Sequence, residues 1–419
     1  MLRLKPALHG STLACLLLVT LGARGLTLSE AFEKAKENTS RIRNQTLSEE
    51  ISQAQKREAY SSVLPELEIS STNTWREEVG GSGVTSSFGE GHQHTAQVTL
   101  RQALFQGGSE YHLLKAAKKY PDIAKWTRVQ EEVDLYAELA QGFCDYLTVE
   151  NEGKILSEQA ALLDQRIKYL TNRVSIGRSK KTELYSARSQ MARVSADIEA
   201  QKIELLKAKE ELAKLTGMVE IAQVEDPLGA QVNWTNIKPT IDVEALPKLK
   251  AAQLILEQSR SETKAAKGDY LPEVDLTGNY YLDRAGVLAS SDWDVSVTAK
   301  WQLYGGGATN ADVRIKTLES RQLELEYEDL KRASQLALER LSQSLAMKVG
   351  EYKKLQEAVA AAERSYREHI RESRSGLVSD LDVLRALDDL LQVKRAANRS
   401  HFQAKNLFYE LHQAAGVRP

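Results

Sequence analysis

The sequence predicts a mainly α-helical chain with some β-structure, built as two tandem repeats of a long coiled-coil helical hairpin plus four strands. Three observations predict this fold class. Short motifs recur at a fixed offset along the 419 residues. Apolar residues keep a period of about 3.5 over several heptads. Four stretches of about ten residues alternate apolar and polar positions, which is typical of half-buried strands.

The start of the chain has the pattern of a secretory signal peptide. A basic beginning, an apolar run from Ser11 to Leu21 and a small-residue cleavage site after Gly25 follow one another. We therefore expect residues 1–25 to be removed. Three basic residues and no acid leave with them, so the formal net charge moves from −2 to −5 (−2 − 3). Without a basic excess, nucleic-acid binding is not expected.

The repeat is visible in glycine-containing motifs. The stretch "LFQGG" at 104–108 recurs as "LYGGG" at 303–307, an offset of 199 (303 − 104), and Gly177 matches Gly376 at the same offset. The stretch "SVLPEL" recurs as "DYLPEV" at an offset of 207 (269 − 62), so the first half holds eight more residues between these landmarks. We divide the chain into repeat 1 (26–217), a linker (218–246) and repeat 2 (247–419).

Heptad spacing predicts one coiled-coil hairpin in each repeat, at 109–217 and 308–416. Each hairpin has a descending helix, a turn at Gly177 or Gly376, and a returning helix. Pro121 predicts a kink or a helix start within the first descending helix. The predicted seam runs through Leu139, Gly142, Tyr146, Val149, Gly153, Leu156, Ala160, Leu163, Ile167, Leu170 and Val174 in the first descending helix, and through Leu338, Leu341, Leu345, Lys348, Tyr352, Leu355, Val359, Ala362, Tyr366 and His369 in the second.

The strands are predicted as two hairpins, 66–105 and 273–303, with the fourth strand ending at 303. Strands of this length suffice to span a membrane when tilted, although a small soluble sheet remains an alternative. Four strands are too few to close a barrel, so membrane insertion would require several chains in one barrel. Aromatic residues suited to an interfacial girdle are Trp75, Tyr280, Tyr281, Trp293 and Trp301.

Glycines separate each strand hairpin from the descending helix that follows. A glycine-rich turn between a strand and a helix is a common phosphate site, but no Lys-Ser/Thr pair follows here and no parallel βαβ unit is present. We interpret them as hinges between strand and helix, where a Cβ would hinder the backbone. These glycines are Gly107, Gly108, Gly305, Gly306 and Gly307.

The sequence holds no motif that predicts an enzyme or a cofactor site. Zinc, phosphate-loop and nucleophile-elbow patterns are missing from it. His92–His94 could chelate a metal, but a solvated loop between the first two strands is the favoured interpretation. Cys144 is the single cysteine after residue 25 and is interpreted as a small packed side chain.

These motifs, in this order and doubled, resemble the TolC-type outer-membrane efflux proteins (outer membrane factors). The resemblance rests on "LTLSEAFEKAKENTSRIR", "ALPKLKAAQLILEQSRSETKAAKGDYLPEV", "LRQALFQGG" with "AKWQLYGGG", and "SRSGLVSDLDVLRALDDLL". It covers nearly the whole mature chain. It implies a homotrimer in the outer membrane, with one 12-stranded barrel (3 × 4) above a periplasmic tunnel. It also implies a passive duct that docks to a periplasmic adaptor and an inner-membrane pump, for drug, metal-ion or type I protein export.

The resemblance also implies a constriction at the periplasmic end, lined by acids six residues after each turn glycine. Those positions hold Glu183 (177 + 6) and Asp382 (376 + 6). A ring of carboxylates at a narrow point would attract cations. A solvated surface position is the alternative for each residue.

The sequence departs from the family pattern around the second turn. Arg385 occupies the position of a second acid, Ser373 that of an aromatic residue, and Val378 that of a basic residue found in some members. The family's gate network is therefore not expected in the same form, and Arg374 and Arg385 could build another.

Two other classes of protein also contain coiled-coil helices. A periplasmic adaptor also contains a coiled-coil hairpin, but normally one hairpin set into β-rich halves. A structural coiled-coil protein of the envelope would not need alternating strands with aromatic ends.

Overall fold

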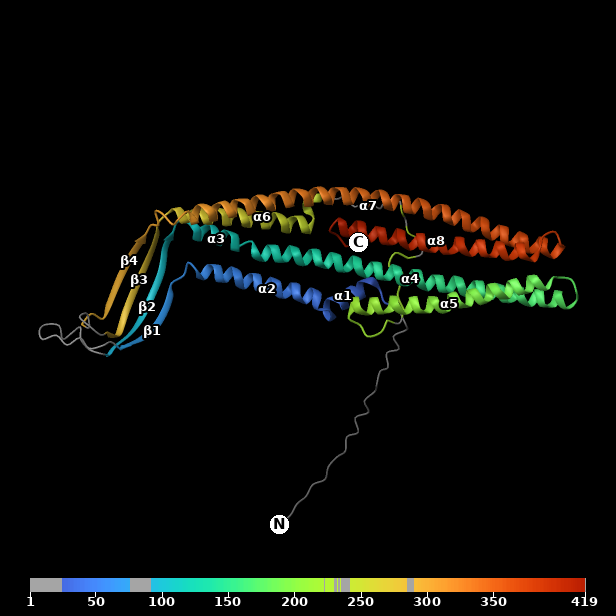
Figure 1. Ribbon diagram of the computed structural model, residues 1–419, viewed down its shortest axis with the longest axis horizontal. Helices are drawn as coiled ribbons and strands as arrows, with labels where there is room; N and C mark the ends of the chain where they lie inside the picture. The colour runs from blue at the N-terminus through green and yellow to red at the C-terminus, as the bar shows by residue number, and fades with distance from the viewer. Residues whose placement is uncertain are drawn as a thin grey trace, which may run out of the picture.

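The computed structural model describes residues 25–75, 92–221, 223–229, 232, 234, 242–284 and 290–418. The predicted signal peptide lies outside the described residues except for Gly25. Long helices run side by side from a sheet at one end to two helical turns at the other (Figure 1). Among the residues described, no helix has both the length and the apolar character needed to cross a bilayer.

Both repeats have the same order of elements: helix, strand pair and helical hairpin. Repeat 1 contains α1 (Leu28–Asn38), α2 (Ser40–Ser61), β1 (Glu66–Trp75), β2 (His92–Gln106), α3 (Ser109–Ala117), α4 (Tyr120–Ser175) and α5 (Lys181–Thr216). The linker ends with η2 (Val243–Ala245). Repeat 2 contains α6 (Pro247–Ala266), η3 (Lys267–Tyr270), β3 (Glu273–Arg284), β4 (Trp293–Lys300), α7 (Ala308–Ser375) and α8 (Asp380–Ala414).

The descending helix is interrupted in repeat 1 and continuous in repeat 2. A new helix, α4, begins at Tyr120 with Pro121 in its first turn, where the missing N–H of proline costs no hydrogen bond. The helix start predicted at Pro121 is therefore confirmed. In repeat 2, α7 runs without a break for 68 residues, or about 100 Å.

The coiled-coil seams form the core of the helical part. Leu163 and Leu170 of α4, Leu184 of α5, and Leu384 and Leu387 of α8 belong to one buried cluster. Because α4 packs against both its own hairpin partner and α8, the hairpins of the two repeats share this core. Burial of each such leucine stabilises the fold by about 2 kcal/mol.

A buried ion pair fixes the linker between the repeats to α8. The Lys405 side chain is 0% exposed, and its Nζ donates to Asp226 Oδ2 (2.5 Å) and to the carbonyl of Gly229 (2.7 Å). Val224 of the same segment forms a parallel bridge with Leu26. The start of the described chain, this part of the linker and α8 therefore meet at one level, partway along the helices (Figure 1).

The sheet is antiparallel throughout, with strand order β1-β2-β3-β4. The predicted end of the fourth strand at 303 is wrong: β4 ends at Lys300, which pairs with Glu273, the first residue of β3. No residue of β3 remains to pair with Trp301, and its indole N–H instead donates to the Tyr270 carbonyl (3.1 Å).

The second strand starts earlier than expected. His92 pairs with Trp75 and His94 pairs with Asn73 at the end of the β1–β2 ladder. The placement of His92–His94 in a loop was therefore wrong: these residues belong to β2.

The two strand-to-helix junctions differ in packing. Gly107 and Gly108 have φ of 65° and 78°, and Gly306 and Gly307 have φ of 68° and 88°, all in the left-handed region. A Cβ at Gly107 would collide with the carbonyl of Gly268 in η3, whereas Gly108, Gly306 and Gly307 face open space. At Gly305 a Cβ would meet only the flexible side chain of Gln302.

This difference predicts unequal costs for two neighbouring substitutions. Gly108→Ala should cost only the left-handed strain of about 1–2 kcal/mol. Gly107→Ala should cost clearly more, because the backbone at Gly268 must also move. Thermal unfolding of the purified protein in detergent compares the two, and equal midpoints would show that η3 does not hold this junction.

Candidate functional site

One face of the sheet is apolar and exposed. Across the four strands, Ile69 faces Val98, Val98 faces Tyr280, and Tyr280 faces Trp293. Directly opposite residues in a ladder share a face, so these four side chains form one row. The next row toward the helices holds Leu67, Leu100, Gly278 and Val295. Ile69 is 74% exposed. An apolar patch of this kind marks a surface that contacts another molecule or a membrane.

The opposite face is polar and internally hydrogen-bonded. Thr99 Oγ1 donates to Asn279 Oδ1 (2.9 Å), and Asn279 Nδ2 donates to Asp294 Oδ1 (2.9 Å). The Tyr281 hydroxyl donates to Asp294 Oδ2 (2.8 Å). A sheet with one apolar and one polar face has the pattern of a transmembrane barrel wall, with a lipid side and a lumen side.

The five predicted girdle aromatics do not share one surface. Trp75, Tyr280 and Trp293 lie on the apolar face, near the loop ends of their strands. Tyr281 lies on the polar face, because side chains alternate along β3. Trp301 lies beyond the end of β4, at the helical end of the sheet.

At the other end of the molecule, the two hairpin turns lie close together (Figure 1). Gly177 (φ 72°) and Gly376 (φ 76°) adopt the left-handed conformation, and a Cβ at either would meet nothing within 4 Å. The N–H of Leu377 donates to the carbonyl of Glu372, which closes α7 with a helix-ending motif.

Glu183 and Asp382 occupy equivalent positions, the third residue of α5 and of α8. Asp382 Oδ2 accepts a hydrogen bond from the Ser379 N–H (3.2 Å), and Ser379 Oγ accepts one from the Asp382 N–H (3.3 Å), which makes a capping box. The Ser379 hydroxyl also donates to Asp382 Oδ2 (2.6 Å). These hydrogen bonds from Ser379 hold the pKa of the Asp382 carboxyl below its usual value. Glu183 Oε2 accepts a hydrogen bond from Ser179 (2.6 Å). Both carboxylates thus cap a helix beside the turns.

A buried polar network near the turns was not expected from the sequence. Arg166 of α4 is ion-paired with Asp380 of α8, and its Nη2 donates to Ser373 Oγ of α7 (3.0 Å). The Ser373 hydroxyl donates to Asp380 Oδ1 (2.6 Å), and Ser179 Oγ lies 3.1 Å from Asp380 Oδ2. We call these four residues the tip network. It joins the turn of repeat 1 to both helices of the hairpin in repeat 2.

The tip network is largely removed from solvent. Asp380 is 5% exposed, and the Arg166 guanidinium lies over the Tyr169 ring, 4.9 Å from its centroid. Burial lowers the pKa of Arg166, but arginine keeps its proton in proteins, so the contact is an ion pair. The sequence singled out Ser373 as a departure from the family, yet nothing in it connects residue 166 with residue 380.

A groove between α5 and α8 lies beside the turns. It has a volume of about 530 Å³ and is lined by Tyr185, Arg193, Leu381 and Asp388, among others. The Leu377 side chain at the adjacent turn is strongly exposed. Apolar side chains next to opposite charges are suited to a helical partner that offers both kinds of contact.

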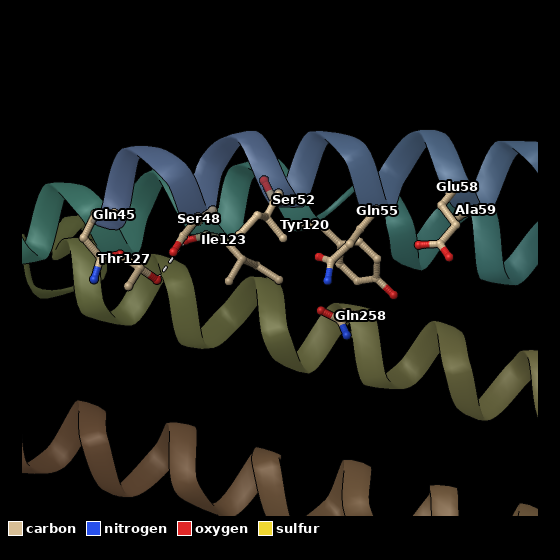
Figure 2. A pocket seen from close by; sticks show the side chains of 12 residues that line it. Gln45, Ser48, Ser52, Gln55, Glu58, Ala59, Tyr120, Ile123, Thr127 and Gln258 are labelled. Atoms are coloured by element: carbon tan, nitrogen blue, oxygen red, sulfur yellow. Dashed lines mark hydrogen bonds between the residues drawn. The ribbon is translucent and has the colours of Figure 1, made fainter. Parts of the chain in front are cut away.

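A second groove lies between α2, α4 and α6, close to the sheet. Figure 2 shows α2 and α6 flanking α4, with Gln45, Gln55, Tyr120 and Gln258 directed between them. Its volume is about 750 Å³. Amides and hydroxyls dominate its lining, so it offers hydrogen bonds without a strong charge.

Cys144 is the one cysteine in the part of the chain that the structure describes. Cys144 is buried, and burial raises the pKa of its thiol to about 12, so the thiolate does not form near neutral pH. Within the described ranges, no three His, Cys, Asp or Glu side chains are placed to hold a metal ion.

Helices of about 100 Å joined to a two-faced sheet define an outer-membrane protein of the channel-tunnel type. The chain belongs to the outer membrane efflux protein family, whose model matches residues 31–218 and 244–417. The two matched segments correspond to the two repeats, and the gap between them falls in the linker.

The chain is also similar in sequence to one individual protein and in fold to solved structures. The chain is 20% identical to the outer membrane efflux protein BepC of Brucella suis over 331 residues, which cover 77% of this chain and 72% of that protein. Its fold is similar to that of CusC (TM-score 0.82, 16% identity, 93% and 92% of the two chains). It is also similar to the outer membrane protein VceC of Vibrio cholerae (TM-score 0.79, 17% identity, 93% and 96%).

Loss of Asp380 should loosen the tip. In Asp380→Ala the buried Arg166 keeps its charge without its partner, which costs about 3–5 kcal/mol. Hydrogen exchange of the amides around residues 173–180 and 373–380 should become faster. The pair Arg166→Met with Asp380→Leu should restore slow exchange, because apolar side chains can replace a buried ion pair.

Asp388→Ala is the control, since Asp388 lies farther along α8, at the edge of the groove. Equal exchange in Asp380→Ala and Asp388→Ala would show that the tip network does not hold the turns.

Proposed function

We propose that the chain is the outer-membrane subunit of a tripartite export system, a passive exit duct for substrates delivered by an inner-membrane pump through a periplasmic adaptor. The observation that carries the proposal is the exposed apolar face of a four-stranded sheet placed at one end of a helical bundle about 100 Å long. The match of the efflux family across both repeats supports it and disfavours an adaptor or a purely structural role.

The edges of the sheet support assembly as a homotrimer. Strands β1 and β4 are the outer strands of the sheet in this chain. In lipid, an open strand edge leaves backbone N–H and C=O groups unpaired at a cost of several kcal/mol each. Pairing β1 of one copy with β4 of the next removes both edges, and three copies supply 12 strands (3 × 4).

The tip supports a gate that can be closed. Glu183 and Asp382 place carboxylates beside both turns, and symmetry would turn them into a ring of negative charge at the periplasmic end. The tip network holds the two hairpins of each copy together. Opening would therefore require the contact between Arg166 and Asp380 to break, with Ser373 and Ser179 released at the same time.

The groove between α5 and α8 is the surface that we assign to the adaptor. Its apolar and charged lining lies next to the exposed Leu377 at the tip. A helical hairpin that offers leucines and opposite charges would fit there.

Membrane fractionation and conductance test the duct. The full chain should be recovered from the outer membrane as a detergent-resistant trimer and should conduct ions in planar bilayers. Recovery of the mature protein as a soluble monomer, with no conductance after reconstitution, would refute the proposal.

At Asp382, the effect of the negative charge on cation block can be separated from the effect of the helix cap on stability. Asp382→Asn keeps an acceptor for the Ser379 N–H but removes the charge, whereas Asp382→Ala removes both. Both should raise the concentration of hexaamminecobalt that half-blocks the channel by about tenfold. Only the alanine variant should also lose stability of α8.

The pH dependence follows from the lowered pKa of Asp382. Because its folded pKa is lowered, the Asp382 carboxyl stays charged at the usual aspartate value of ~3.9 and below it, and its contribution to stability is complete above that value and is lost as the pH falls through the lowered pKa. Block by hexaamminecobalt should therefore be constant from neutral to mildly acidic pH.

For the Asp382 variants the control is Glu199→Gln, which removes an exposed acid of α5 away from the turn. An unchanged block in Asp382→Asn would remove this residue from the constriction.

A further inference from the structure

A polar cluster interrupts the apolar face of the sheet at its outward end, far from the helices. Its members come from three adjacent strands: Ser71 from β1, His94 from β2 and Asp283 from β3. Ser71 Oγ lies 3.1 Å from His94 Nε2, and His94 Nδ1 lies 2.8 Å from Asp283 Oδ2. The His94 side chain is 36% exposed and that of Asp283 is 59% exposed. The cluster is therefore accessible from the apolar side of the sheet.

The two nitrogens of His94 have the partners required for acyl transfer. A carboxylate at Nδ1 favours the tautomer that carries its proton there, so Nε2 is left as an acceptor for the serine proton. The same carboxylate would stabilise the imidazolium that forms when Nε2 takes that proton. We propose that Ser71, His94 and Asp283 form a serine-esterase site on the apolar face of the sheet.

A β-bulge brings Asp283 to this face. The β2–β3 register shifts between Ala96 and Gln97, so that Gln97 pairs with Tyr281 but Ala96 pairs with Asp283. In a regular ladder Leu282 would pair with Ala96, and Asp283 would lie on the polar face. Bulges commonly re-aim a side chain next to an active site. Here the extra residue places a carboxylate beside His94.

Asn73 supplies a group for the oxyanion. It lies two residues from Ser71 on the same face and directly opposite His94. Its Oδ1 is 3.2 Å from His92 Nε2, which orients the amide. The amide N–H groups of an asparagine can stabilise the negative charge of a tetrahedral intermediate, and loss of one such donor lowers kcat by about 10²–10³-fold.

The surroundings define the class of substrate. Toward the helices, the next positions on this face are the apolar Ile69 on β1, and Ala96 and then Val98 on β2. A carboxylic ester with a long acyl chain would place its carbonyl at Ser71 and its chain along these residues. That the ester belongs to a membrane lipid rests on the proposed function, which places this face in the outer membrane. The arrangement of Ser71, His94 and Asp283 does not depend on it.

The reaction consumes one water. Ser71 Oγ attacks the carbonyl carbon, and its proton moves to His94 Nε2. The bond between the acyl carbon and the alcohol oxygen then breaks, and the alcohol leaves with that proton. Water, deprotonated by His94, attacks the acyl-serine and releases the carboxylic acid, while the proton returns to Ser71.

A fluorophosphonate probe tests the nucleophile directly on the purified full chain in detergent micelles. Attack by Ser71 would form a bond from its oxygen to phosphorus and expel fluoride. We expect labelling of the peptide that contains Ser71, loss of labelling in Ser71→Ala, and at least tenfold slower labelling in Asp283→Asn. Ser70→Ala is the matched control, because Ser70 pairs with Gln97 on the opposite face and should label at the normal rate.

Ester hydrolysis is the second readout. The protein should cleave p-nitrophenyl laurate faster than p-nitrophenyl butyrate, and Ser71→Ala, recovered as the same oligomer, should lose this activity. Labelling or hydrolysis that is equal in wild-type protein and Ser71→Ala would overturn the esterase site. His94 would then serve only to hydrogen-bond β2 to its two neighbouring strands. Labelling of Ser71 in a protein that forms no channel would refute the duct and leave the esterase site standing.

Discussion

The packing of α4 against both α5 and α8 is the constraint on which the rest of the structure depends. The seam leucines of α4 belong to the core of their own hairpin and also to the core shared with repeat 2. Without this double contact, each hairpin would be a separate coiled coil. Because the apolar spacing is kept over many heptads, the helices reach far from the sheet without a globular core around them.

Two buried polar contacts fix how the helices are aligned along their length. One lies partway along the helices and the other lies near the turns. Lys405 ties the linker to α8, and the tip network ties α4 to α7 and α8. Leucine seams alone allow neighbouring helices to slide by a heptad, since each turn offers similar surfaces. A buried charge whose partners occupy fixed positions does not allow this, because displacement leaves it unpaired at a cost of several kcal/mol. The polar contacts thereby set the register of the helices.

Much of this architecture could be predicted from one sequence, because it is periodic or repeated. The seams, the glycine turns and the limits of β1 follow from local pattern. The end of β4 was wrong because alternation continues through Trp301 in the sequence, while pairing stops where β3 begins. The cap at Asp382 has a sequence signal, "SDLD". The pairs of Arg166 with Asp380 and of His94 with Asp283 have none, since they depend on packing and on a bulge.

The interruption between α3 and α4 makes the two repeats mechanically unequal. On the side of repeat 2, the uninterrupted α7 connects the tip to the sheet as one stiff rod. In repeat 1 the corresponding connection contains a joint near Tyr120, where a bend can occur without breaking a continuous helix. A displacement that begins at the tip would therefore reach the sheet along one continuous helix in repeat 2, but across a helix break in repeat 1. Each copy in an assembly would thus contribute one continuous helix and one interrupted helix between the tip and the sheet.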